Sequence, residues 1–207
     1  MEQMNDQQLW TLFLQGDQQA YHDIYALYYQ NLYSYGLRKV NEPELVRDCI
    51  QDLFVNLWSG RKNLNSTDNI KYYLLASLKN LLIRAATQNT RWQGIDADTL
   101  NQFQLEFNLE SEYIRKENMS LQAKALMDAL DQLTPRQKEV LYLRYFEELS
   151  FEEIADLLDI SVRAVYKLGY RAIDALKLIL NLPKSDILML LATYRIEISL
   201  SAGHFLR

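Results

Sequence analysis

Two carboxylates, Asp48 and Asp52, lie one helical turn apart in a segment whose apolar residues recur at helical spacing. With Gln51 and Val55 they fall at i, i+3, i+4 and i+7, so all four share one helix face, which we call the carboxylate face. Paired carboxylates can perform general acid and base catalysis. No histidine, glycine-rich loop or metal-ligand set accompanies them, so we expect no catalytic residue, metal or cofactor. We interpret the carboxylate face as a partner-docking surface, with a solvated helix face as the alternative.

A second candidate group lies between residues 161 and 180, where four basic residues and one acid give a local charge of +3 in a chain of net charge −5. The apolar residues Val165, Leu168, Ala172 and Leu176 predict the buried side of a helix. A basic and aromatic helix face can enter the major groove, reading base edges and neutralising phosphates. A solvated face of a helical bundle is the alternative. The polar side, here called the recognition stripe, is Ser161, Arg163, Tyr166, Lys167, Tyr170 and Arg171.

A third group lies between residues 61 and 90, where five basic residues and one acid give a local charge of +4. Amides and aromatic rings among basic residues suit unpaired bases, which offer edges to hydrogen-bond and faces to stack. Core or rim positions explain the same residues equally well on composition alone. The members of this amide-rich group are Arg61, Lys62, Asn63, Asn69, Lys71, Tyr72, Lys79 and Asn80.

Four helices are predicted to position the first and third groups. Helical spacing of apolar residues, glycine stops and acidic or proline starts predict helices over residues 6–15, 17–37, 41–60 and 67–88. The second of these carries an apolar and aromatic stripe that we assign to the core: Tyr21, Ile24, Tyr25, Tyr28, Leu32 and Tyr35. We expect one helical bundle over residues 1–88.

The second half predicts a helix-turn-helix. Thr134-Pro135 and Ser161 are helix starts, and Ser150 to Glu153 is a capping box. Asp159 occupies the turn between a short and a longer helical pattern, where a left-handed conformation is often needed. Residues 89–118 are acidic and polar, so we interpret them as a linker between the bundle and a second domain over residues 119–181. A further helix, about 186–197, is predicted within a 182–207 extension of unknown role.

Composition agrees with an all-α fold of two helical domains, because three Pro and six Gly in 207 residues are too few for the turns of a β protein. A single cysteine permits no disulfide and suits a reducing cytoplasm. The acidic N-terminus is unlike a signal peptide, and the apolar stretch 187–193 is too short for membrane insertion.

Together, these segments resemble an extracytoplasmic-function sigma factor of the bacterial primary sigma superfamily. The resemblance covers about residues 20–88 and 120–178, and two separate motif sets occur in the family's order. In the first domain it rests on Tyr25-Ala-Leu-Tyr-Tyr29, Leu32-Tyr-Ser-Tyr35, Asp48-Cys-Ile-Gln-Asp-Leu-Phe54, Trp58, Tyr73-Leu74 and Asn80. In the second it rests on Leu133-Thr-Pro-Arg-Gln-Lys-Glu-Val140, Leu143-Arg-Tyr145, Leu149-Ser-Phe-Glu-Glu-Ile-Ala155 and Ile160-Ser-Val162.

The resemblance implies a non-enzymatic factor that recognises promoters and opens DNA within RNA polymerase holoenzyme. Region two would dock on core polymerase through the carboxylate face and hold unpaired −10 bases on the amide-rich group. Region four would bind the −35 element through the recognition stripe, and an anti-sigma factor is implied as a further partner. The alternative is a helix-turn-helix regulator that binds duplex DNA without polymerase. An acidic factor of this kind should bind free DNA poorly and depend on polymerase for most phosphate contacts.

Overall fold

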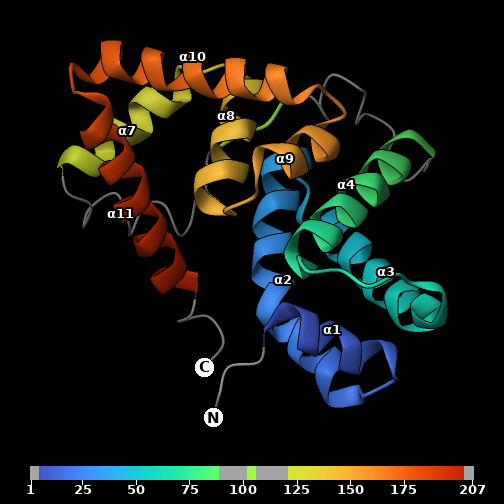
Figure 1. Cartoon of the computed structure of the whole chain (residues 1–207). Helices are drawn as coiled ribbons and strands as arrows, with labels where there is room; N and C mark the ends of the chain where they lie inside the picture. Colours follow the sequence, from blue (N-terminus) through green and yellow to red (C-terminus); the bar gives the residue numbers. More distant parts are fainter. Residues whose placement is uncertain (1–4, 89–101, 106–120, 203–207) are drawn as a thin grey trace. The chain divides into compact units, whose positions relative to one another are not determined.

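The computed structural model describes residues 5–88, 102–105 and 121–202, and these ranges contain helices and no strand (Figure 1). The expected all-α fold is therefore confirmed. The chain divides into two compact units, residues 1–100 and 101–207. Within the described ranges, no helix is long and apolar enough to cross a membrane.

In the described residues 5–88, unit 1 has four α-helices and a short 3-10 helix. They are α1 (Asp6–Leu14), α2 (Gln18–Val40), α3 (Pro43–Gly60), η1 (Arg61–Asn63) and α4 (Ile70–Gln88). All four predicted helices are confirmed. Asp17 caps α2, Pro43 opens α3, and Gly16 separates α1 from α2 at a φ of 92°, a conformation that glycine adopts without strain. Helix α2 runs past the predicted end at residue 37, because Asn41 takes the left-handed C-cap conformation at a φ of 50°.

The core of unit 1 draws on every one of its α-helices. Trp10, Ile24, Ile50 and Leu74 are each 1% exposed or less and come from α1, α2, α3 and α4 in turn. Helix α3 packs against both α2 and α4. At Gly36, α2 and α3 approach so closely that a Cβ would lie 2.6 Å from Cγ1 of Val46. The outer side of α3 and parts of the loop before α4 lie outside this core and are exposed.

Unit 2 contains the predicted helix-turn-helix. Its elements are α7 (Leu121–Asp131), α8 (Pro135–Leu141), a π-helix η3 (Tyr142–Phe146), α9 (Phe151–Leu158), α10 (Val162–Leu180) and α11 (Lys184–Ala202). Thr134, Ser150 and Ser161 cap α8, α9 and α10 as predicted, the first two in capping boxes. Asp159 has a φ of 55°, so the turn between α9 and α10 uses the left-handed conformation expected there.

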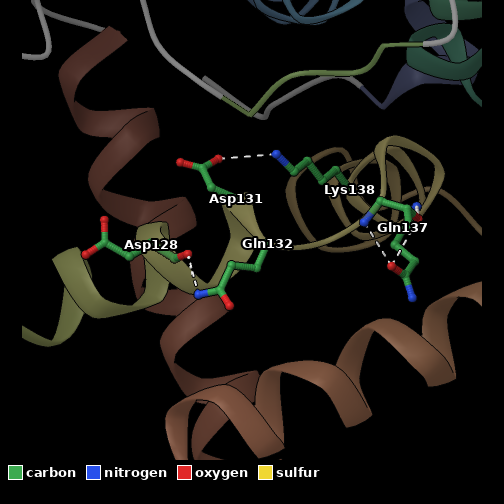
Figure 2. A network of polar contacts seen from close by, with 6 residues as sticks. Asp128, Asp131, Gln132, Gln137 and Lys138 are labelled. Atoms are coloured by element: carbon green, nitrogen blue, oxygen red, sulfur yellow. Dashed lines mark hydrogen bonds and ion pairs between the residues drawn. The ribbon is translucent and has the colours of Figure 1, made fainter.

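The junction between α7 and α8 is fixed by polar contacts. Figure 2 shows Nζ of Lys138 paired with Oδ1 of Asp131 at 3.3 Å, and Nε2 of Gln132 donating to the backbone oxygen of Asp128 at 3.2 Å. Gln137 completes the capping box by accepting from the backbone N–H of Thr134 at 3.0 Å. Of these contacts, the pair between Lys138 and Asp131 links α8 to the end of α7.

Two apolar residues of the predicted linker are buried, which an exposed linker would not show. Phe103 and Leu105 are buried, and the Phe103 ring lies 5.5 Å from the ring of Tyr142 in η3. The free energy gained by burying an aromatic side chain offsets the conformational entropy lost when its backbone is ordered. This part of the segment is therefore anchored to unit 2. Residues 89–101 and 106–118 of the predicted linker lie outside the described residues. The predicted C-terminal helix is confirmed as α11, which contacts α7, α10 and η3 and buries Ile187 and Leu191.

Candidate partner and nucleic-acid interfaces

The structure places all four members of the carboxylate face on the outer side of α3. Asp48, Gln51, Asp52 and Val55 are exposed, and Val55 alone keeps 57% of its surface open. An exposed valine within an acidic face gives that face an apolar contact point. This combination of charge around an apolar contact is typical of protein interfaces.

Cys49, next to this face in sequence, is buried on the inner side of α3. Burial raises the pKa of its thiol to about 11, and the charges of Asp52 and Asp48 add to that rise. A thiol with so high a pKa stays protonated at neutral pH, so it is a poor nucleophile. The thiol is therefore a packing group of the bundle.

Sequence reasoning missed an aromatic row on α2. Tyr25, Tyr29 and Tyr33 follow one another at four-residue spacing, with ring centroids 5.2 and 6.1 Å apart. The Tyr25 ring also contacts Phe54 of α3 at 4.8 Å, and the guanidinium of Arg47 lies 5.8 Å from the Tyr33 ring. Tyr25 was assigned to the core, but it is 41% exposed. The i, i+4, i+8 repeat of one residue type was the signal that could have revealed this tyrosine ladder.

The amide-rich group surrounds the loop between η1 and α4. Lys62, Asn63 and Asn80 are exposed, whereas Arg61, Asn69, Lys71, Tyr72 and Lys79 are half-buried. Arg61 and Asn69 make contacts that hold the loop and the start of α4. Arg61 donates from Nη1 to the backbone oxygen of Trp58 at 2.6 Å and lies over the Trp58 ring at 4.2 Å. Asn69 accepts from the backbone N–H of Tyr72 at 2.9 Å, which caps the first turn of α4.

The recognition stripe is open along its whole length. All six members are exposed, with Tyr166 at 51% and Tyr170 at 67%. Ser161 is also the N-cap of α10, accepting from the backbone N–H of Ala164 at 3.2 Å. On the opposite side Val165, Ala172 and Leu176 are buried as predicted.

Two details of α10 differ from the prediction. Leu168 is only half-buried, and Ile173, which was not predicted, takes a buried position instead. Tyr166, although exposed, has one ring face on Phe151 of α9, with centroids 4.1 Å apart. Phe151 of α9 thus supports the exposed side chain of Tyr166 from within the helix-turn-helix.

Within the described part of the chain, no group of three His, Cys, Asp or Glu side chains could hold a metal ion. What the three groups offer is exposed charge, amides and aromatic rings on rigid helices. Such surfaces bind partners and nucleic acid through hydrogen bonds, stacking and phosphate neutralisation.

Sequence comparison gives a match on each unit. The family described as "Sigma-70 region 2" matches residues 24–91, and "Sigma-70, region 4" matches residues 123–176. Among curated proteins of Bacillus subtilis (strain 168), RNA polymerase sigma factor YlaC is 27% identical over 164 residues, covering 79% of this chain and 92% of its own. ECF RNA polymerase sigma factor SigX is 22% identical over 170 residues, covering 80% of this chain and 86% of its own.

Two solved structures share the fold. CnrH, determined in complex with the cytosolic domain of CnrY, gives a TM-score of 0.54 at 20% identity, covering 85% of this chain and 97% of that one. The sigma factor RpoE of Bartonella quintana, determined with the anti-sigma factor NepR, gives 0.54 at 18% identity, covering 78% and 97%. Both similarities concern the arrangement of helices.

Proposed function

This chain belongs to the sigma-70 family as an extracytoplasmic-function sigma factor that directs RNA polymerase to promoters, and from that premise we propose which of its surfaces perform each step. Unit 1 docks on core polymerase and holds the opened −10 element. Unit 2 binds the −35 element as duplex. The polymerase supplies the chemistry of RNA synthesis, so this chain acts without catalysis, and it works in the cytoplasm, where the polymerase is.

Docking on polymerase is assigned to the carboxylate face. Its support is the exposure of Asp48, Gln51, Asp52 and Val55 on a helix whose other side is fully packed. We add the tyrosine ladder to this surface, because Arg47 and Phe54 of α3 contact its rings and so join it to the same helix. Aromatic side chains and an acidic rim together suit a basic, apolar partner surface.

Recognition of unpaired −10 bases is assigned to the amide-rich group. The exposed Lys62 and Asn63 and the helix residues Lys71, Tyr72, Lys79 and Asn80 provide phosphate neutralisation, hydrogen bonds and one ring face. Arg61 and Asn69 contribute by holding the loop and the start of α4, as their contacts with Trp58 and Tyr72 support.

Recognition of the −35 duplex is assigned to the recognition stripe of α10. The stripe lies on the second helix of a helix-turn-helix, the helix that enters the major groove in this motif. Its N-terminal half carries Arg163, Tyr166 and Lys167, all exposed and so free to reach base edges. Tyr170 and Arg171, one turn later, reach the flanking phosphates.

An anti-sigma factor is the regulator that we propose for this chain. Support comes from the two solved structures with its fold, because RpoE was determined with the anti-sigma factor NepR and CnrH with the cytosolic domain of CnrY. A partner that covers the carboxylate face would compete directly with polymerase for this chain.

The observation that carries the assignment is the coincidence of two family matches with two groups of basic and aromatic residues, the amide-rich group on unit 1 and the recognition stripe on unit 2. Run-off transcription tests it. Purified chain is added to core polymerase on a library of promoter fragments from the source genome, and we expect specific start sites that core polymerase alone does not produce. Duplex binding without polymerase, combined with no stimulated transcript, would favour the helix-turn-helix regulator instead.

A further inference from the structure

The loop between η1 and α4, Leu64 to Asn69, is held in place by a helix that lies outside the matched sigma regions. In this loop the side chains of Asn65, Ser66 and Asp68 are exposed. The exposed Lys62 and Asn63 directly precede the loop. Helix α1, Asp6–Leu14, precedes the region-two match, which begins at residue 24. Two side chains of α1 nevertheless bond to this loop and to the helix that follows it.

Trp10 is the first of these side chains. It is 1% exposed, and its Nε1–H donates to the backbone oxygen of Asn65 at 2.9 Å. The indole ring also lies 5.2 Å from the ring of Tyr73 in α4. A buried indole has few alternative positions, so this bond fixes the loop backbone at its centre.

Asp6 is the second. Its Oδ2 accepts from the backbone N–H of Ile70, the first residue of α4, at 3.1 Å, so a residue from another helix caps α4. Its Oδ1 accepts from the hydroxyl of Tyr28 at 2.7 Å. Burial and this bond together raise the pKa of Tyr28 well above its ordinary value, so Tyr28 remains a donor at every pH at which the protein is used. Asp6 is therefore held on one side by α2 while it holds α4 on the other.

From these contacts we infer that α1 positions the −10 loop: Asp6 and Trp10 hold Leu64–Asn69 in the conformation that receives unpaired promoter bases. The inference rests on the assignment of the amide-rich group to the −10 element. The two bonds go to backbone atoms, of Asn65 within the loop and of Ile70 directly after it, which leaves the Asn65 side chain exposed. A loop ordered in advance loses less conformational entropy when single-stranded DNA binds, so the effect falls on base capture rather than on polymerase docking.

The test uses holoenzyme and a promoter on which the unmodified chain is active. W10F keeps an aromatic ring in the core but removes the N–H donor, D6A removes both acceptors, and D6N keeps one amide oxygen for the Ile70 N–H. Phe13→Leu is the matched control, because Phe13 is also a fully buried aromatic residue of α1. Its ring contacts the rings of Trp10, Tyr21 and Trp58. For each variant we measure affinity for a single-stranded −10 oligonucleotide, permanganate reactivity of unpaired thymines, affinity for core polymerase and the unfolding midpoint.

We expect W10F and D6A each to weaken −10 oligonucleotide binding by about fivefold, the effect of losing the one hydrogen bond that each residue makes to the loop or to the residue after it, with a matching loss of permanganate reactivity. Core affinity should be unchanged, and D6N should recover most of the D6A loss. Phe13→Leu should lower the unfolding midpoint at least as much as W10F does, yet keep −10 binding. Equal losses in Phe13→Leu and W10F, or unchanged −10 binding in W10F and D6A, would overturn the inference. Failure of the unmodified holoenzyme to bind the −10 oligonucleotide would instead overturn the assignment of the amide-rich group.

Discussion

The ring of Phe151, in the first turn of α9, supports the ring of Tyr166 in α10, with centroids 4.1 Å apart and planes inclined by 30°. The guanidinium of Arg144 lies 4.8 Å from the Phe151 ring and donates from Nη1 to the backbone oxygen of Leu149 at 2.8 Å. Three side chains from successive elements therefore form one layer. Its outermost member, Tyr166, is half exposed on the recognition stripe, so packing inside the motif decides where this ring can meet DNA.

Removal of the supporting ring is the first prediction. Phe151→Ala should weaken binding of −35 duplex by holoenzyme several-fold. An aromatic pair contributes about 0.5–1.5 kcal/mol of stabilising free energy, which here holds the Tyr166 ring in place. Competition for duplex fragments with and without the −35 element measures the effect. Tyr166→Phe is the control, since it keeps the stack and removes only the hydroxyl. A Phe151→Ala variant that retains full −35 discrimination would show that Tyr166 needs no support from α9.

Charge reversal on α3 is the second prediction. Asp48→Lys combined with Asp52→Lys should lower affinity for core polymerase by more than tenfold, because each reversed charge meets like charge on a complementary partner surface. Gln18→Lys with Gln19→Lys, at exposed positions of α2, adds positive charge elsewhere on unit 1 and should leave affinity nearly unchanged. Co-purification with core polymerase measures both. Equal binding by the two double variants would refute the docking role of the carboxylate face.

Close packing of α2 on α3 gives the third prediction. Gly36→Ala should lower the free energy of unfolding of unit 1 by about 1–3 kcal/mol, because the new Cβ would lie 2.6 Å from Cγ1 of Val46. Chemical denaturation followed by circular dichroism measures the change. Gly60→Ala, where a Cβ would have no neighbour within 4 Å, is the matched control and should not destabilise the chain. Combining Gly36→Ala with Val46→Ala should relieve the clash, and a failure of that rescue would contradict this explanation.

Local sequence signals predicted most of the helical architecture. The caps at Thr134, Ser150 and Ser161 and the left-handed turn at Asp159 are encoded within a few residues, so they could be identified without any tertiary information. Asn41 carries the same kind of signal at the end of α2 and could have been found, because asparagine tolerates the left-handed conformation.

The parts of the fold that escaped prediction depend on contacts between distant segments. The bond from Trp10 to Asn65 spans 55 residues, and the cap from Asp6 to Ile70 spans 64, so no periodicity reveals them. The polar composition around Phe103 and Leu105 gave no sign that both are buried or that Phe103 contacts Tyr142. The carboxylate face and the recognition stripe followed from helical period, and the amide-rich group from composition, whereas the stacking of Tyr166 on Phe151 required the angle between α9 and α10.

The buried thiol of Cys49 gives the last prediction. Burial, with the charges of Asp52 and Asp48 adding to it, raises the pKa of this thiol from 9.0 to about 11. The protonated form is favoured in the folded chain, so this group's contribution to stability is complete below pH 9.0 and is lost as the pH rises toward 11. At pH 8 the folded chain should hold about 100-fold less thiolate than the unfolded chain, because two pKa units separate them.

Iodoacetamide labelling followed by mass spectrometry measures that difference, with chain unfolded in denaturant as the reference. The variant carrying Asp48→Lys and Asp52→Lys should label faster than the unmodified folded chain, because the two charges that raise the thiol's pKa are replaced by charges that lower it. It should remain slower than the unfolded chain, since burial is the larger cause of the shift. Because the thiol is buried, equal labelling of the variant and the unmodified folded chain would show that access of the reagent, and not the charge at positions 48 and 52, controls the reaction, whereas labelling as fast as in denaturant would reveal an unfolded variant. The same measurement therefore shows whether the variant that loses polymerase binding still has a folded α3.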